Sequence, residues 1–215
     1  MEVINTPVSP YIQNAPIAYC PSTLESIYVD PGDEIEKLVN VSNELDLKPQ
    51  YIFITHGHID HAGAAAELAR ELNLEIIGPH IEDKFLLDVL EIQGQMYGMK
   101  AENFTPSKWL THNDSISFGN QKLEILLCPG HTPGHIIAVN HQAKKVIGGD
   151  VLFNGSIGRT DLPGGNFELL IESVKNKLWP LGNDIEFIPG HGPVSTFSVE
   201  RASNPFVSDN VLGLS

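Results

Sequence analysis

The sequence predicts a mixed α/β fold in which helices cover β-sheets. Two observations favour this class: strand-sized and helical segments alternate over the first 90 residues, and a run of strands and turns then precedes one more helix and strand. Glycine and proline are spread along all 215 residues, so no linker divides the chain. We therefore expect a single domain over residues 1–215.

The amino-terminal half alternates strands with helices. Short strands broken by prolines occupy the first thirty residues and end in the apolar segment 26–29. Apolar residues at helical spacing then predict a helix with Asp33 as its N-cap, closed by Pro49. Three elements follow: a buried strand over 51–54, an alanine-rich helix over 61–72 and a strand over 75–77.

The second half is richer in strands. A helix over 80–90 is expected to end in a loop through Gly94 and Gly98. Further strands are predicted over 115–118, 122–128, 136–140 and 144–147. The last predicted elements are a helix near 166–178 and a strand over 186–188.

Composition excludes several classes of protein. Hydrophobic residues make up 41% and charged residues 19%, which indicates a folded globular chain. The 13 basic and 27 acidic residues give a net charge of −14, the wrong sign for a nucleic-acid or anionic membrane partner. No apolar run reaches the length of a membrane span, and no signal peptide is visible. With two cysteines, Cys20 and Cys128, we expect reduced thiols and a cytoplasmic location.

Three imidazoles and one carboxylate lie within six residues, directly after the strand over 51–54. This segment reads Thr55-His56-Gly57-His58-Ile59-Asp60-His61. These groups cannot all be core residues, because each would need its own buried partner. Three more polar residues follow other predicted strands through glycine-bearing turns, namely His131, Asp150 and His191.

Strand ends of this kind bring their side chains to one sheet edge, so seven donors are expected to converge there: His56, His58, Asp60, His61, His131, Asp150 and His191. Nitrogen and oxygen donors without thiolate suit zinc, with iron or manganese as alternatives. Seven donors are too many for one tetrahedral ion, whereas two ions that share Asp150 would use them all. The competing interpretation is a solvated histidine-rich loop, which the density of the cluster disfavours.

The remaining histidines and Cys128 are not expected to bind metal. His80, His112 and His141 are predicted to lie at the surface or in turns, and His135 to hydrogen-bond within the turn that precedes it. Cys128 lies in an apolar run and is predicted to be buried and unreactive. The chain has no glycine-rich phosphate loop and no Gly-x-Ser-x-Gly elbow, so nucleotide binding and serine hydrolysis lack support.

His-x-His-x-Asp-His at 56–61, followed by His131, Asp150 and His191, resembles the metallo-β-lactamase superfamily over essentially the whole chain. The resemblance implies a four-layer αβ/βα sandwich with the metals at one edge of the two central sheets. It implies two sets of metal ligands, His56, His58 and His131 for one ion and Asp60, His61 and His191 for the other. Asp150 would bridge the ions, and Asp30 would support the metal-binding loop.

The Pro-Gly-His segments at 129–131 and 189–191 are similar to those of the glyoxalase II group, the hydroxyacylglutathione hydrolases. The resemblance implies that metal-bound hydroxide hydrolyses a small-molecule thioester such as a glutathione conjugate, with Asp60 and Asp150 as catalytic carboxylates. Little chain follows His191, so we expect the short, single-domain bacterial type without the carboxy-terminal helical domain that grips glutathione.

Arg159 stands where glyoxalase II has a thiol-binding lysine, and Asp161 where it has a tyrosine, so both are candidate substrate contacts or an ion pair with each other. Gly158-Arg159-Thr160-Asp161 also resembles persulfide dioxygenases, whose single iron would lie on His56, His131 and Asp150. A lactonase or another hydrolase of the superfamily is a further alternative, and a non-catalytic metal-binding protein is a third class. We expect a monomer or small homo-oligomer.

Overall fold

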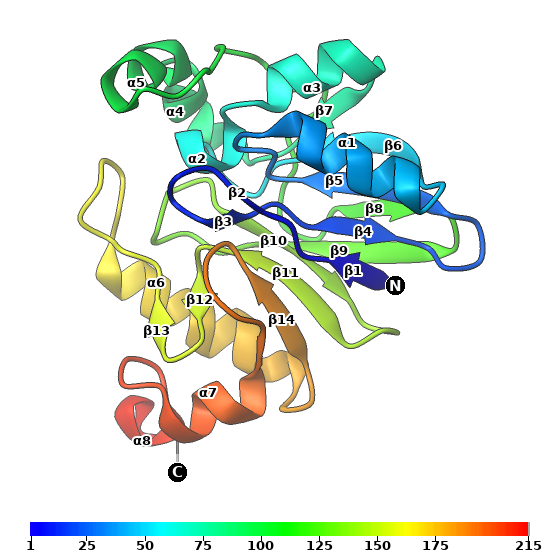
Figure 1. The fold of residues 1–215 in the computed structure, drawn as a ribbon. Coiled ribbons are helices and arrows are strands. Elements are labelled where there is room, and N and C mark those ends of the chain that lie inside the picture. The colour runs from blue at the N-terminus through cyan, green and yellow to red at the C-terminus, as the bar shows by residue number, and fades with distance from the viewer. Residues whose placement is uncertain (215) are drawn as a thin grey trace.

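Two β-sheets pack face to face in the computed structural model, which describes residues 1–214 (Figure 1). The first sheet has the order β1 (Glu2–Ile4), β4 (Ile17–Tyr19), β5 (Glu25–Val29), β6 (Lys48–Phe53) and β7 (Glu75–Ile77). The second has the order β15 (Ser195–Thr196), β14 (Glu186–Pro189), β11 (Lys145–Gly149), β10 (Ile136–Asn140), β9 (Gln121–Leu127) and β8 (Ser115–Phe118).

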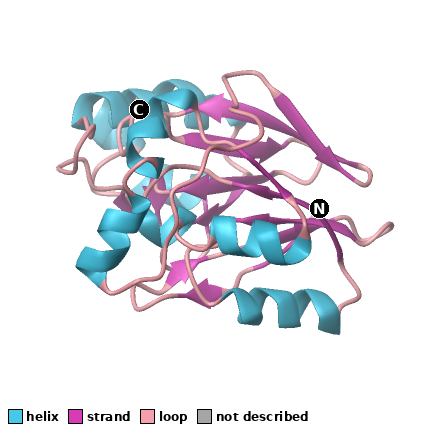
Figure 2. Ribbon diagram, turned by 90° about the horizontal axis from the view of Figure 1, so that it is seen from above, coloured by secondary structure: helices cyan, strands magenta, loops and turns pink. Residues whose placement is uncertain are grey.

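Helices cover the outer side of each sheet, as the two views show (Figures 1 and 2). The helices on the side of the first sheet are α1 (Ile35–Glu44), α2 (Ile59–Ala62), α3 (Ala65–Leu72), α4 (Lys84–Leu87) and α5 (Leu90–Tyr97). Those on the side of the second are α6 (Phe167–Ser173), α7 (Phe197–Ser203) and α8 (Asp209–Leu212). The predicted four-layer sandwich is confirmed. None of the helices within residues 1–214 combines the length and apolar character needed to cross a membrane.

Strand alternation explains why the core has three apolar layers. Successive residues of a strand face opposite sides of the sheet. In β6, Ile52 packs under the helices of the first sheet, whereas Phe53 packs between the two sheets. In β11, Ile147 joins Phe53 between the sheets and Val146 packs toward α6. The central strands β5, β10 and β11 are therefore buried on both faces, whereas the edge strand β8 is exposed at alternate residues.

One edge of the sandwich collects the loops that carry the predicted donors. Strands β5, β6 and β7 pair in parallel, and so do β11 and β14, so each set ends at a common edge. Five loops meet at this edge, and they begin after β5, β6, β9, β11 and β14. Two short hairpins flank it, β2 (Pro7–Val8) with β3 (Gln13–Asn14), and β12 (Leu152–Phe153) with β13 (Ser156–Ile157).

Two predicted helix boundaries of the amino-terminal half are wrong. Asp33 is not the N-cap of α1: Glu34 holds that position at φ +47°, and the Asp33 carboxylate accepts the Glu34 backbone N–H instead. Pro49 lies inside β6, where the pairing with β5 shifts register between Pro49 and Tyr51. The irregularity accommodates a residue that has no backbone N–H to donate to the ladder.

The predicted helices over 61–72 and 80–90 are each divided. Gly63 and Ala64 separate α2 from α3, and a Cβ on Gly63 would lie 2.9 Å from the Gly32 carbonyl oxygen of the loop after β5. The second helix becomes the 3₁₀ turn η1 (Ile81–Asp83) followed by α4, and the expected glycine loop is helix α5. Gly94 lies within α5, where a Cβ would meet the Met99 carbonyl oxygen at 2.6 Å. Tertiary contact here overrides the low helix propensity of glycine.

Candidate metal centre

The structure brings together all seven predicted donors at this edge. Two groups have ligand atoms within 4.8 Å of one another: His56, His58 and His131, and Asp60, His61 and His191. Asp150 lies between the groups. Its Oδ1 is 3.4 Å from His61 Nε2, and its Oδ2 is 3.5 Å from His131 Nε2 and 3.7 Å from His191 Nε2. One carboxylate therefore faces members of both groups.

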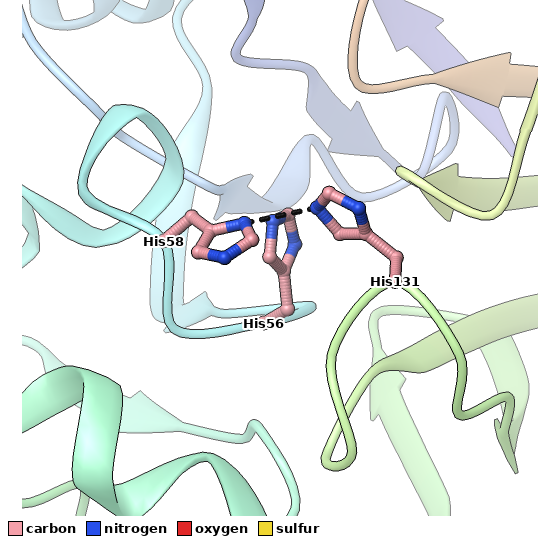
Figure 3. A group of neighbouring side chains, drawn as sticks. All are labelled: His56, His58 and His131. Carbon is pink, nitrogen blue, oxygen red and sulfur yellow. Dashed lines mark hydrogen bonds between the residues drawn. The ribbon is translucent and has the colours of Figure 1, made fainter. Parts of the chain in front are cut away.

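In the first group, two loops point their imidazoles at one another (Figure 3). His131 Nδ1 donates to the Arg159 carbonyl oxygen at 2.7 Å, so its Nε2 carries the lone pair and accepts from His58 Nδ1 at 2.9 Å. His56 Nδ1 donates to the Thr55 hydroxyl at 3.0 Å. The second nitrogen of His56 is consequently an unprotonated donor that faces the centre of the group.

Burial keeps these three imidazoles neutral. It lowers the pKa of His56 well below its usual value, and neighbouring histidines add to the effect. Burial and the adjacent His131 lower the pKa of His58 to about 3. Burial also lowers the pKa of His131, although Asp150 opposes the shift. Neutral imidazole is the form that binds metal ions.

In the second group, Asp30 lies beneath the loop that follows β6. Its carboxylate accepts the Thr55 backbone N–H at 2.7 Å, the Thr55 hydroxyl at 2.6 Å and His61 Nδ1 at 2.9 Å. His61 Nε2 therefore faces Asp60 and Asp150. Burial lowers the pKa of His61, but these two carboxylates outweigh it and hold the pKa well above its usual value. The surroundings of His61 Nε2 thus favour a positive charge.

The donor set fits divalent metal ions. Three buried atoms that face the centre have no hydrogen-bond partner among the described residues, namely His56 Nε2, His61 Nε2 and Asp150 Oδ1. Buried polar atoms without a partner are rare in folded proteins, and a bound cation would satisfy all three. Asp30 also lies close to His56 and His61, but its oxygens already accept three hydrogen bonds from Thr55 and His61.

Gly190 allows Asp150 to lie this close to His61. A Cβ on Gly190 would lie 2.0 Å from Asp150 Oδ1 and 2.6 Å from His61 Cε1. The Pro-Gly-His segment after β14 is thus a close approach of the backbone to the donor carboxylate. Any side chain at position 190 would displace Asp150.

His135 differs from its prediction. It is fully buried, and its Nε2 accepts the Asp150 backbone N–H at 2.9 Å instead of bonding within the preceding turn. Its ring stacks on that of His56, with the centroids 4.7 Å apart. His135 thereby holds the Asp150 loop against the loop after β6. Its place immediately before Ile136–Val139, the apolar part of strand β10, is the sequence feature that indicates burial.

The other residues outside the donor set lie where they were expected. His112 and His141 are exposed, and half-buried His80 accepts the Glu82 backbone N–H at the start of η1. Cys128 is buried, and burial raises the pKa of its thiol to about 12. A thiol with so high a pKa is not a nucleophile at neutral pH.

A cavity of about 520 Å³ opens over the donors. Most of its wall is apolar or aromatic, and the residues are Tyr11, Ile59, Leu86, Tyr97, Phe153, Ile157, Leu162 and Pro163. Arg159 is the only lysine or arginine among the described residues that line it. Its guanidinium binds the Asp161 carboxylate with two hydrogen bonds, of 2.8 and 2.7 Å, so the predicted ion pair forms. Asp161 itself is outside the lining.

The fold and the ordered donors define a known family. The model of the metallo-beta-lactamase superfamily matches residues 25–191, and the chain belongs to this superfamily. The chain is 41% identical to hydroxyacylglutathione hydrolase GloC of Haemophilus influenzae, over 97% of this chain and 99% of that protein. The resemblance stated from the motifs is confirmed at this level.

Two solved structures are similar over nearly their full length. BLEG-1, named as a B3 metallo-beta-lactamase, has a TM-score of 0.88 and 31% identity, and the match covers 96% of this chain and 99% of that one. TTHA1623 in a di-iron-bound form has a TM-score of 0.86 and 33% identity, with 95% and 100% covered. These comparisons support a metallo-hydrolase of the superfamily.

Proposed function

We propose that this chain is a dinuclear metal-dependent thioester hydrolase of the hydroxyacylglutathione hydrolase type. The observation that carries the proposal is Asp150, whose two oxygens face the two donor groups at the floor of a cavity. The first ion would lie on His56, His58 and His131, and the second on Asp60, His61 and His191. The similarity to GloC supports thioesters as the substrate class.

Bound divalent ions would supply a hydroxide at neutral pH and positive charge for the developing oxyanion. The protein itself holds the reacting groups. Burial would raise the pKa of Asp150, but His61 and His131 outweigh it and keep that pKa below its usual range, so Asp150 stays an anionic bridge. We assign to Asp60 the acceptance of a proton on the cavity side, because its carboxylate lines the cavity 3.2 Å from His191 Nε2.

The cavity wall favours a thioester with an apolar body and few charges. Arg159 would hold a carboxylate of the thiol portion, because a guanidinium can bind a carboxylate through two hydrogen bonds. Asp161 already occupies that face, so substrate would have to displace an exposed ion pair. The tyrosines Tyr11 and Tyr97 offer aromatic area beside the acyl group. We therefore expect weak dependence of turnover on the glutathione portion.

Zinc is the metal we propose, with iron or manganese as alternatives. The proposal includes a cytoplasmic location, a small-molecule partner and a monomer or small homo-oligomer. Cys20 and Cys128 are free and buried, as a reducing compartment permits.

The test compares two reactions on one preparation. Protein loaded with zinc, and separately with iron, is assayed for hydrolysis of S-lactoylglutathione and for oxygen uptake with glutathione persulfide. We expect hydrolysis with both metals and no oxygen uptake. Oxygen uptake by the iron form without thioester hydrolysis would establish instead the one-iron dioxygenase on His56, His131 and Asp150.

A further inference from the structure

Asp83 is a buried carboxylate that sequence analysis did not single out. It ends η1 and is 0% exposed. Its Oδ2 accepts the Gly57 backbone N–H at 2.9 Å and the Thr132 hydroxyl at 2.7 Å, and its Oδ1 accepts the Gly134 backbone N–H at 2.6 Å. No lysine or arginine of the described chain forms an ion pair with it.

The three donors belong to the two loops of the first donor group. Gly57 lies between His56 and His58, and Thr132 directly follows His131. His58 and His131 face each other at 2.9 Å across the gap that these loops enclose (Figure 3). The Asp83 carboxylate thus binds both the loop that carries His58 and the loop that carries His131.

The local backbone is shaped around this carboxylate. A Cβ on Gly134 would lie 2.6 Å from the Asp83 backbone nitrogen and 2.7 Å from its carboxylate. A Cβ on Gly57 would lie 2.8 Å from the Leu86 Cβ. Only glycine at both positions lets the loops approach Asp83 and the start of α4, so the sequence accommodates this approach at two separate points.

Burying a carboxylate without a cation is costly unless hydrogen bonds compensate. Burial raises the pKa of Asp83 to about 6, and the hydrogen bonds oppose the shift, so the group is ionised at neutral pH. A hydrophobic residue would fill the same space, but it would leave the Gly57 and Gly134 N–H groups and the Thr132 hydroxyl without their acceptor. What the carboxylate adds is the fixed relation between the two loops.

We propose that Asp83 is a positioning residue that fixes His58 relative to His131 and thereby sets the metal affinity of the first donor group. This inference rests on the metal centre of the proposed function, but not on the reaction. Asp60, His61 and His191 donate none of the three hydrogen bonds to Asp83, so the group that they form should keep its affinity.

Glu200 is a matched control. It is 1% exposed and accepts three hydrogen bonds, from the Ser195 hydroxyl at 2.5 Å, the Gly155 backbone N–H at 2.9 Å and the Asn204 amide at 2.8 Å. It therefore has the burial and donor types of Asp83, but its donors are not in the loops of the first group. Glu200→Gln should lower stability without changing metal affinity.

The experiment titrates zinc into metal-free protein against a chromophoric chelator, with urea unfolding of each variant in parallel. Asp83→Asn should weaken one of the two zinc affinities by roughly 10- to 100-fold, the range seen when an outer partner of a metal ligand is lost. The absorption spectrum of cobalt(II) at that site should change as well. Glu200→Gln should leave both affinities and the cobalt spectrum as in the wild type.

Thr132→Val keeps the carboxylate and removes one donor, so it tests the same contact if Asp83→Asn does not fold. A smaller loss of the same zinc affinity is expected. The proposal would be overturned if Asp83→Asn or Thr132→Val kept both zinc affinities of the wild type. It would also be overturned if Asp83→Asn and Glu200→Gln lost zinc affinity equally. Wild-type protein that binds two zinc ions without hydrolysing thioesters would remove the proposed reaction and leave the role of Asp83 standing.

Discussion

The donor edge and the cavity wall around Arg159 differ in how firmly the chain holds them. Asp30, beneath the donor edge, is 2% exposed and accepts three hydrogen bonds. The Arg159 side chain is 61% exposed, and its guanidinium has Asp161 as its one partner among the described residues. An exposed ion pair contributes little to stability, so the wall can rearrange around a ligand at little cost. On the proposed function, the chemistry belongs to the buried edge and the specificity to the exposed wall.

The largest effect is expected from the carboxylate between the two donor groups. Asp150→Ala should lower thioester turnover by more than about 100-fold, beyond the range for loss of an outer partner of a ligand, and should weaken both metal affinities. Steady-state kinetics and metal analysis check this. His141→Ala is the control, because that imidazole is exposed and pairs with Glu124. Retention of both metals by Asp150→Ala would contradict the bridging role.

The next largest effect is expected from Asp30→Ala. This change removes the carboxylate that binds Thr55 and His61 without removing a proposed metal ligand. It leaves three buried donors, the two of Thr55 and His61 Nδ1, without an acceptor. The metal-free protein should therefore lose about 3–9 kcal/mol of unfolding free energy, at about 1–3 kcal/mol for each unsatisfied buried group. Urea unfolding measures this loss. Asp161→Ala, at an exposed site, should leave the unfolding free energy nearly unchanged.

Substitution of Arg159 in the cavity wall should change KM, whereas substitution of Asp150 should change turnover. Arg159→Ala should raise KM for S-lactoylglutathione about tenfold and leave kcat unchanged, as expected when binding is lost equally in ground and transition states. Arg70→Ala is a matched control, since the Arg70 side chain is as exposed as that of Arg159 and forms a two-bond pair with Glu102. A change confined to kcat would place Arg159 in the chemistry and remove the contrast between edge and wall.

The smallest effect is expected from Asp161→Asn. This change weakens the hold on Arg159 and should lower KM about twofold, within the free energy of an exposed pair. A higher KM would indicate that Asp161 contacts the substrate itself. Initial rates on S-lactoylglutathione and on a truncated thioester separate the two outcomes.

The donors could be predicted from the sequence because their pattern is local. His56, His58, Asp60 and His61 lie within one segment after a strand, and turns of the same kind introduce the remaining three. The four-layer fold followed from a resemblance, while the element order alone predicted only sheets covered by helices.

The supporting residues could not be predicted, because their partners are backbone groups brought close by the fold. Nothing in the sequence separates Asp83 from its neighbour Glu82, since both stand at a helix start. His135 precedes β10 and accepts a hydrogen bond from the backbone of Asp150, which follows β11. The loop predicted at Gly94 was wrong for the same reason. Gly94 lies in helix α5, where it allows the backbone of Met99 to approach closely. Local propensity does not report such contacts.

Metal content per chain tests the central claim most directly. Fully loaded protein is analysed for bound metal, and the ions are located by anomalous X-ray scattering in crystals of the same preparation. Two ions per chain are expected, one at His56, His58 and His131 and the other at Asp60, His61 and His191, with Asp150 between them. One ion per chain at a single position would contradict the dinuclear centre.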